Sequence, residues 1–196
     1  MNLTELQDEV IGITGRPDLS DRILSAIRNS TLKAHRSDFY TKDKILTVFD
    51  TGDESYEKQV STLVGFVRFR KLSFARIYDN SAQTYGPQFD PIDPENMDEE
   101  DGIPRPYICF EAGDHYIFRS KTKFQYIYVC YFQDPIITTD GFASWIAIHN
   151  PWAIIHEAAA QVFRQIGQID KFKAQRDLAS DEYALLRVQH IQSIGY

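Results

Sequence analysis

The sequence predicts an α+β fold in which N- and C-terminal helices form a helical bundle that carries an inserted small antiparallel β unit. Apolar residues recur at helical spacing near both ends of the chain, whereas aromatic and β-branched residues run through its middle. The chain has 196 residues, of which 43% are hydrophobic, and this is enough to bury a core. We expect the bundle to span residues 1–38 and 146–196, and the β-rich insertion to span residues 39–145.

Two helices are expected at the N-terminus. Apolar residues recur every three or four positions from Leu3 to Ile13, and Asn2 is a favoured N-cap residue. This pattern predicts a helix over 2–14. A Gly-Arg-Pro turn follows, and a second apolar face predicts a helix over 19–36.

Strands are expected in the middle of the chain. The β-rich runs are residues 45–49, 66–78, 107–110, 115–118 and 124–132. The second run changes phase at its centre, so that a bulge near Arg70 reconciles it as a strand, with a helix as the alternative. Residues 79–106 carry five of the eight prolines and are expected to form a long exposed loop.

The C-terminal part returns to a helical pattern. Asn150 and Pro151 form a favoured N-cap and first helical residue, and a broad apolar stripe follows them. A further, more polar helix is expected over 169–194, with Ser180 as an alternative point of restart.

The net charge of −7 is concentrated in one segment. Seven acids and no basic residue lie between positions 90 and 101, and the remaining 21 acids balance the 21 basic residues. These acids are Asp90, Asp93, Glu95, Asp98, Glu99, Glu100 and Asp101. A neutral body with an acidic segment is a poor general binder of nucleic acid, because phosphate binding needs a cationic surface.

The acidic segment has three interpretations: a solvated loop, a contact with a basic partner surface, and a calcium site. The chain itself offers a basic surface on the expected strand over 66–78. Its basic residues are Arg68, Arg70, Lys71 and Arg76. The acidic segment of one subunit could therefore meet the basic strand of its neighbour. Such a head-to-tail contact is heterologous, and it makes a ring when the rotation closes.

No catalytic signature stands out. His156 and Glu157 open a zinc-protease pattern, but Ala160 occupies the position of the second ligand. Cys109 and Cys130 lie in apolar runs, which indicates buried thiols. We expect no enzyme, no cofactor, no metal and no membrane segment, and synthesis in the cytoplasm without a targeting signal.

Aromatic residues are numerous, and most of them are expected to build the sheet. Those in or near expected loops are better candidates for contact with a partner, because aromatic residues dominate interface anchors. They are Tyr85, Phe89, Phe142, Trp145 and Trp152.

Four stretches in order along the chain carry a resemblance. They are Gly15-Arg16-Pro17-Asp18, the motif from His35 to Tyr40, the run from Tyr131 to Pro135, and the approach from Trp145 to Pro151. Their order resembles that of tailed-bacteriophage head-to-tail adaptor proteins, the connector or tail tubular protein A-like family. The resemblance implies a structural virion protein, made in the host cytoplasm and placed in the neck between head and tail.

Members of that family form rings, usually twelve-fold, beneath the portal. The resemblance therefore implies a homo-oligomer that contacts the portal protein and a tail or nozzle protein. It also implies a channel through which double-stranded DNA passes without sequence-specific binding.

The C-terminal segment from residue 169 onward is the expected docking element for the portal or a neighbouring subunit. Its expected anchors are Leu186, His190, Ile191 and Tyr196. Other interpretations stay open: another phage neck or tail subunit, a metal-dependent hydrolase that uses the acidic segment, and a small carbohydrate-binding module.

Overall fold

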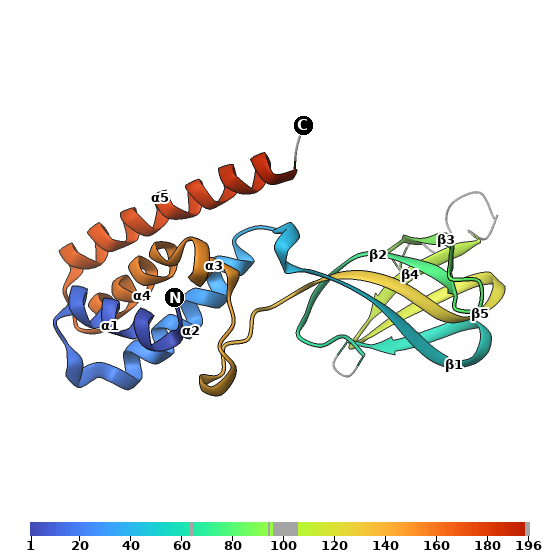
Figure 1. Ribbon diagram of the computed structural model, residues 1–196, viewed down its shortest axis with the longest axis horizontal. Helices are drawn as coiled ribbons and strands as arrows, with labels where there is room; N and C mark the ends of the chain where they lie inside the picture. The colour runs from blue at the N-terminus through green and yellow to red at the C-terminus, as the bar shows by residue number, and fades with distance from the viewer. Residues whose placement is uncertain (63–64, 94, 96–105, 195–196) are drawn as a thin grey trace. The chain divides into compact units, whose positions relative to one another are not determined.

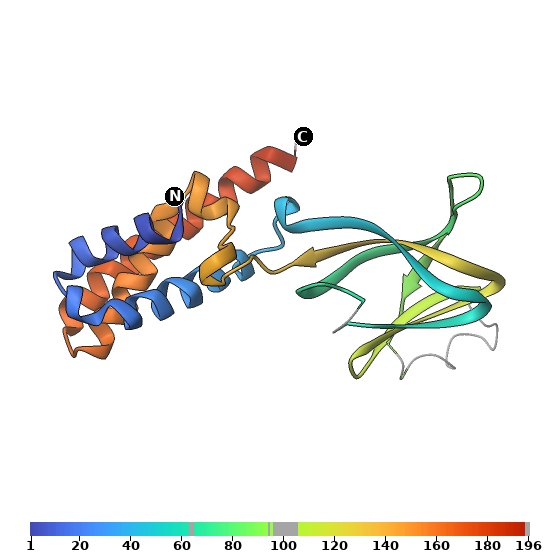
Figure 2. The same cartoon turned by 60° about the horizontal axis from the view of Figure 1, so that its bottom comes forward.

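A computed structural model describes residues 1–62, 65–93, 95 and 106–194, and side chains as far as residue 192 (Figures 1 and 2). The chain divides into two compact units. The helical unit comprises Met1–Asp43 and Asp134–Tyr196, and the β unit comprises Lys44–Gln133. The β unit is therefore inserted between two parts of the helical unit.

The described part of the helical unit contains five α-helices. They are α1 (Leu3–Thr14), α2 (Ser20–Arg36), α3 (Trp145–His149), α4 (Pro151–Gln165) and α5 (Ile169–Ile194). Helix α4 is central, because all four other helices contact it, and α5 runs along it in Figure 1. Small buried residues of α4, such as Ala158 and Ala159, let its neighbours approach closely.

The two expected N-terminal helices are confirmed within two residues. At the start of α1, the side chains of Asn2 and Glu5 each accept the other's backbone N–H at 2.9 Å, which completes a capping box. At its end, Gly15 has the left-handed conformation (φ 64°) that a side chain disfavours. Helix α5 is unbroken, so the alternative restart at Ser180 is wrong, and the short helix α3 was not predicted.

The β unit contains five described strands. They are β1 (Lys44–Ser61), β2 (Phe69–Asp79), β3 (Thr84–Pro91), β4 (Tyr107–Ala112) and β5 (His115–Gln133). One edge of β5 pairs with β1, and its other edge pairs with β2 and then with β4. Because β3 joins β2 to β4, strands β5, β2, β3 and β4 close into a small barrel with β1 as an extra strand. Figure 2 shows β1 and β5 as a long curved pair.

The expected fold class is therefore wrong in its β part: the fold is α+β with a closed barrel, not a helical bundle with a small antiparallel β unit. Strand β3 lies inside the stretch expected to be a loop, and it pairs with β4 in parallel, Asp90 opposite Ile108. Pro87 and Pro91 suggested a loop because proline cannot donate a ladder hydrogen bond. Pro91 is the last residue of β3, and Pro87 lies between Tyr85 and Gln88, where the register against β2 shifts. Proline is tolerated at strand ends and at such irregularities.

The expected strand over 66–78 is confirmed from Phe69 onward as β2, whereas residues 66–68 precede the strand. The helical alternative is wrong. Its register against β5 shifts between Phe69 and Lys71 and again between Leu72 and Phe74. The first shift is the bulge expected near Arg70. Bulges bend a strand and increase its twist, which helps a sheet of few strands to close.

Alternate residues of the strands fill the barrel core. The buried core residues are Val60, Phe66, Ala75, Phe89, Cys109, Phe118, Phe124, Ile127, Val129 and Tyr131. The ring of Phe89 lies 5.2 Å from that of Phe118 and 5.5 Å from that of Phe124, so β3 supplies a central core residue. No helix in the described ranges has the length and apolar character needed to cross a membrane.

Candidate functional site

The outer face of the β unit carries aromatic residues. On β5, Ile127 and Val129 point into the core, so strand alternation directs Tyr126 and Tyr128 outward. The outward neighbour of Tyr128 on β2 is Arg76. Side chains directly opposite each other in an antiparallel pair share a face, so these residues lie together on the outside of the barrel.

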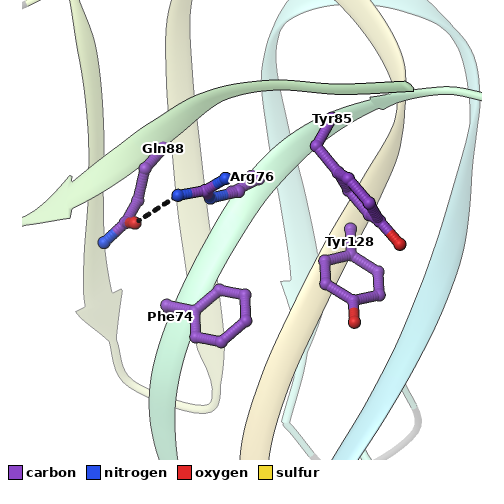
Figure 3. Close-up of a pocket in the computed structure, with 5 residues that line it drawn as sticks. All are labelled: Phe74, Arg76, Tyr85, Gln88 and Tyr128. Carbon is purple, nitrogen blue, oxygen red and sulfur yellow. Dashed lines mark hydrogen bonds between the residues drawn. The ribbon is translucent and has the colours of Figure 1, made fainter.

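A surface pocket lies on this face, with a volume of about 230 Å³. Its lining residues come from three adjacent strands, and we call it the Tyr85 pocket. They are Phe74 and Arg76 of β2, Tyr85 and Gln88 of β3, and Tyr128 of β5 (Figure 3). The volume is below the range of about 300–1,000 Å³ typical of drug-sized ligands, which suits one ring or one side chain.

The walls of the pocket are aromatic rings that support one another. The ring centroids of Tyr85 and Tyr128 are 4.7 Å apart at an angle of 55°, and those of Phe74 and Tyr128 are 6.0 Å apart. Tyr78 extends the cluster, with its ring 5.6 Å from that of Tyr85. Tyr85 is nevertheless 57% exposed, so much of its surface is available for contact.

The polar groups of the pocket lie at one end. In Figure 3 the Arg76 guanidinium points toward the Gln88 amide, to which it donates a hydrogen bond of 3.4 Å. Burial raises the pKa of Tyr128, and the neighbouring Tyr85 hydroxyl adds to the shift, so the Tyr128 phenol stays neutral. A cation, an amide and neutral phenols beside ring faces favour a partner with both a flat or extended apolar part and an anionic part.

Sequence reasoning identified Tyr85 and Arg76 but not the pocket. Tyr85 was expected in a loop, whereas it lies on β3. Phe74, Gln88 and Tyr128 were missed, because each resembles an ordinary strand residue. The alternation of Tyr126 and Tyr128 on β5 was the available signal, but the pairing of β5 with β2 and of β2 with β3 was needed to interpret it.

The other expected contact aromatics lie elsewhere. Phe89 is buried in the barrel core, Phe142 and Trp145 pack against the core of the helical unit, and Trp152 is exposed on α4. The Trp152 ring stacks on that of His156 at 5.3 Å.

The expected basic residues lie at or near β2. Arg68 directly precedes the strand with a positive φ of 51°, and Lys71 pairs in register with Phe132. The Arg70 guanidinium lies 6.0 Å from the centre of the Phe132 ring. Of these four residues, Arg76 alone lines the Tyr85 pocket.

The expected acidic residues are only partly described. Asp90 is the last residue but one of β3 and is exposed, and Asp93 and Glu95 follow the strand and are exposed as well. Asp98, Glu99, Glu100 and Asp101 lie outside the described residues, together with residues 94, 96–97 and 102–105 of the expected loop. Within the described residues, no group of three or more His, Cys, Asp or Glu side chains is arranged to hold a metal ion.

The expected docking residues on α5 face different ways. Leu186 is buried in the core of the helical unit, the ring of His190 contacts that of Tyr40 at 5.2 Å, and Ile191 is exposed. Tyr196 lies outside the described residues. Leu186 thus holds α5 to its own unit.

A second polar cluster lies inside the helical unit. His35 Nδ1 lies 2.8 Å from Asp43 Oδ1, and His35 Nε2 lies 2.9 Å from Ser144 Oγ. The order Ser-His-Asp resembles the arrangement of nucleophilic hydrolases. However, all three residues are buried, and Ser144 Oγ accepts the backbone N–H of Ala147 at 3.1 Å as the N-cap of α3.

This cluster is better explained as a structural clamp, here called the His35 clamp. Trp145 Nε1 donates to Asp43 Oδ1 at 2.7 Å, so one carboxylate oxygen accepts from two rings. Because a carboxylate only accepts, His35 carries a hydrogen on Nδ1, which it donates to Asp43. The clamp ties the end of α2 to the start of α3 on either side of the inserted β unit.

His156, from the incomplete zinc-protease pattern, contacts a side chain of α5. Its Nδ1 lies 2.7 Å from the Gln175 side-chain oxygen. Comparison of the chain with known protein-family models and with curated proteins found no match to either.

Proposed function

We propose that this chain is a structural subunit of a phage neck, a head-to-tail adaptor that forms a ring between the portal and the tail. The observation that carries the proposal is the outward-facing Tyr85 pocket on a β unit that is itself inserted into a helical frame. Tyr and Arg are enriched among the residues that dominate binding at protein interfaces. The order of parts along the chain, on which the resemblance to adaptor proteins rests, also supports the proposal.

Apolar surface is also exposed next to the pocket. Leu46 and Val48 of β1 are opposite Cys130 and Tyr128 of β5, on the same outer face, and are 57% and 40% exposed. Strand β1 pairs only with β5 among the described strands, so its other edge is open to another chain. An adaptor subunit needs such surfaces, because it contacts neighbouring copies and other proteins at once.

Helix α5 presents apolar residues on two sides. Leu186 is buried, whereas Leu178, Leu185 and Val188 are about half exposed. Positions seven and three residues apart lie on one side of a helix, so these three form a stripe that faces away from the core. We propose this stripe as the contact of the helical unit with the portal or a neighbouring subunit, in place of Leu186.

The test is recovery of partners with the tagged full chain from infected cells, followed by mass spectrometry and negative-stain microscopy. An adaptor is expected to recover a portal protein and a tail protein in stoichiometric amounts, as ring-shaped particles. Recovery of neither, from a lysate that contains assembled particles, would contradict the proposal.

A matched pair of variants tests the stripe on α5. Leu185→Glu places a charge on the stripe and should prevent recovery of the partners while the chain stays folded. Lys173→Glu reverses an exposed charge on the same helix and should recover them normally. Equal recovery with both variants would remove α5 from the contact.

A further inference from the structure

We propose that the Tyr85 pocket of one copy binds the acidic, proline-containing segment over residues 90–106 of a second copy. This inference rests on the proposed function, in which copies of the chain lie side by side. It names the part of each copy that forms the contact.

The pocket has the chemistry to bind such a segment. Aromatic rings that line a groove recognise proline-containing extended peptides, because proline packs flat on a ring and costs little conformational entropy to hold. Phe74, Tyr85 and Tyr128 supply the rings. Arg76 is the one charged residue among those that line the pocket, so the pocket favours an anionic partner.

Arg76 has unused hydrogen-bonding capacity. A guanidinium carries five N–H donors. Among the described residues, Arg76 makes one hydrogen bond, the 3.4 Å contact with Gln88, and it is exposed. A carboxylate of a second chain could accept two parallel hydrogen bonds from it.

The acidic segment matches the pocket in charge and composition. It holds seven acids, no basic residue before position 105, and four prolines: Pro91, Pro94, Pro104 and Pro106. The rest of the chain has balanced charge, so the segment is the main anionic part of the molecule. Its described acids, Asp90, Asp93 and Glu95, are exposed.

Both ends of the segment are hydrogen-bonded to their own barrel. The Ile92 N–H donates to Cys109 O at 2.9 Å, and Pro106 O accepts the Lys121 N–H at 2.9 Å. The segment starts on β3, the strand that also carries the pocket residues Tyr85 and Gln88, and it ends just before β4. The choice of a second copy over the same chain therefore rests on the proposed function, in which copies lie side by side.

The experiment is a complementation test by sedimentation velocity on the full chain. One variant, Arg76→Glu with Tyr85→Ala, removes the pocket. The other neutralises the segment with Asp98→Asn, Glu99→Gln, Glu100→Gln and Asp101→Asn. Each variant alone should lose self-association at least tenfold in affinity, and an equal mixture should form pairs again, because each supplies the half that the other lacks.

Controls separate this contact from a general effect of charge. Arg164→Glu reverses an exposed basic residue of α4, and Asp8→Asn, Glu9→Gln, Asp177→Asn and Asp181→Asn neutralise four exposed acids of the helical unit. Both controls should associate as the unmodified chain does. Association should also weaken as salt is raised, because exposed charge pairs are screened.

A synthetic peptide of residues 90–106 gives a direct reading by calorimetry. It should bind the unmodified chain and the segment variant, and not the pocket variant. No binding at about 1 mM peptide, or variants that associate normally, would overturn the inference. If the pairing fails but both variants still bind the portal, the proposed function stands. If the pairing depends on the pocket but the chain does not bind the portal, only the proposed function is contradicted.

Discussion

The helical unit and the β unit place their polar and aromatic groups in opposite ways. In the helical unit, His35, Asp43 and Trp145 are turned inward, and both rings are hydrogen-bonded to Asp43 Oδ1 in the His35 clamp. In the β unit, Tyr85 and Arg76 are turned outward around a pocket, and the core is almost entirely apolar. Similar residue types thus stabilise one unit and are displayed by the other.

This difference indicates a division of work. A buried, hydrogen-bonded cluster contributes mainly to a unique, rigid fold, since any unpaired member is costly. An exposed aromatic cluster contributes little to folding and is retained where it contacts something else. In the proposed function, the helical unit is a frame that ties the chain together on both sides of the insertion, and the β unit adds a contact surface to the stripe on α5.

The strongest test of the comparison is Asp43→Ala. It leaves the buried His35 N–H and the half-buried Trp145 N–H without their shared acceptor, and it should lower the free energy of unfolding of the helical unit by about 3–5 kcal/mol. Both tryptophans, Trp145 and Trp152, lie in the helical unit, so their fluorescence during urea unfolding reports on that unit.

Two variants sharpen this result. Asp43→Asn keeps an acceptor oxygen and should lose less stability than Asp43→Ala. Asp140→Ala removes an exposed carboxylate of the same unit and should change stability by less than about 0.5 kcal/mol. If Asp43→Ala is no worse than Asp140→Ala, the clamp is not what holds the frame.

The second test is Phe89→Ala in the β unit. Phe89 is 1% exposed and packs on Phe118 and Phe124, so truncation should cost about 3 kcal/mol through lost burial and a cavity. Hydrogen exchange should show loss of protection in β2 to β5. On the same strand, Tyr85→Ala should cost less than about 1 kcal/mol, since that ring faces solvent. Equal losses would mean that the outer rings also stabilise the barrel.

The third test concerns a local signal, the capping box of α1. Asn2→Ala removes the acceptor of the Glu5 N–H and should cost about 1 kcal/mol. The loss should appear as earlier unfolding in the fluorescence of the helical unit. Asp21→Ala, in the first turn of α2, makes no cap hydrogen bond and should cost less. Equal stability of Asn2→Ala and the unmodified chain would show that α1 is held by packing alone.

The local signals are the ones that the sequence revealed. The N-cap at Asn2 and the turn at Gly15 located α1 and the start of α2, because such features depend on neighbours a few residues away. The feature whose loss is expected to lower the free energy of unfolding most, the His35 clamp, was not visible in the sequence. The clamp joins His35 to Ser144 across 109 positions, and no local pattern marks that pairing.

The β unit illustrates the same limit. Pro87 and Pro91 made β3 resemble a loop, and the closed barrel follows only when β3 is known to bridge β2 and β4. The pocket then depends on two further registers, Arg76 with Gln88 and Arg76 with Tyr128. Residue types that favour strands were recognised, but pairing partners are set by long-range packing that one sequence does not display.

The smallest expected effect concerns a buried polar group of the helical unit that lacks a hydrogen-bond partner within the part of the chain that the structure describes. The Tyr183 hydroxyl of α5 is buried and has no hydrogen-bond partner among the described residues, and burial strongly raises the pKa of this phenol. Tyr183→Phe removes the unsatisfied group and keeps the ring, so the helical unit should be unchanged or more stable by up to about 1 kcal/mol. Tyr128→Phe on the β unit should change stability by less than about 0.5 kcal/mol, because that side chain is only partly buried. A clear loss of stability in Tyr183→Phe would mean that the hydroxyl is satisfied by water, and that the frame is closed by a buried solvent molecule.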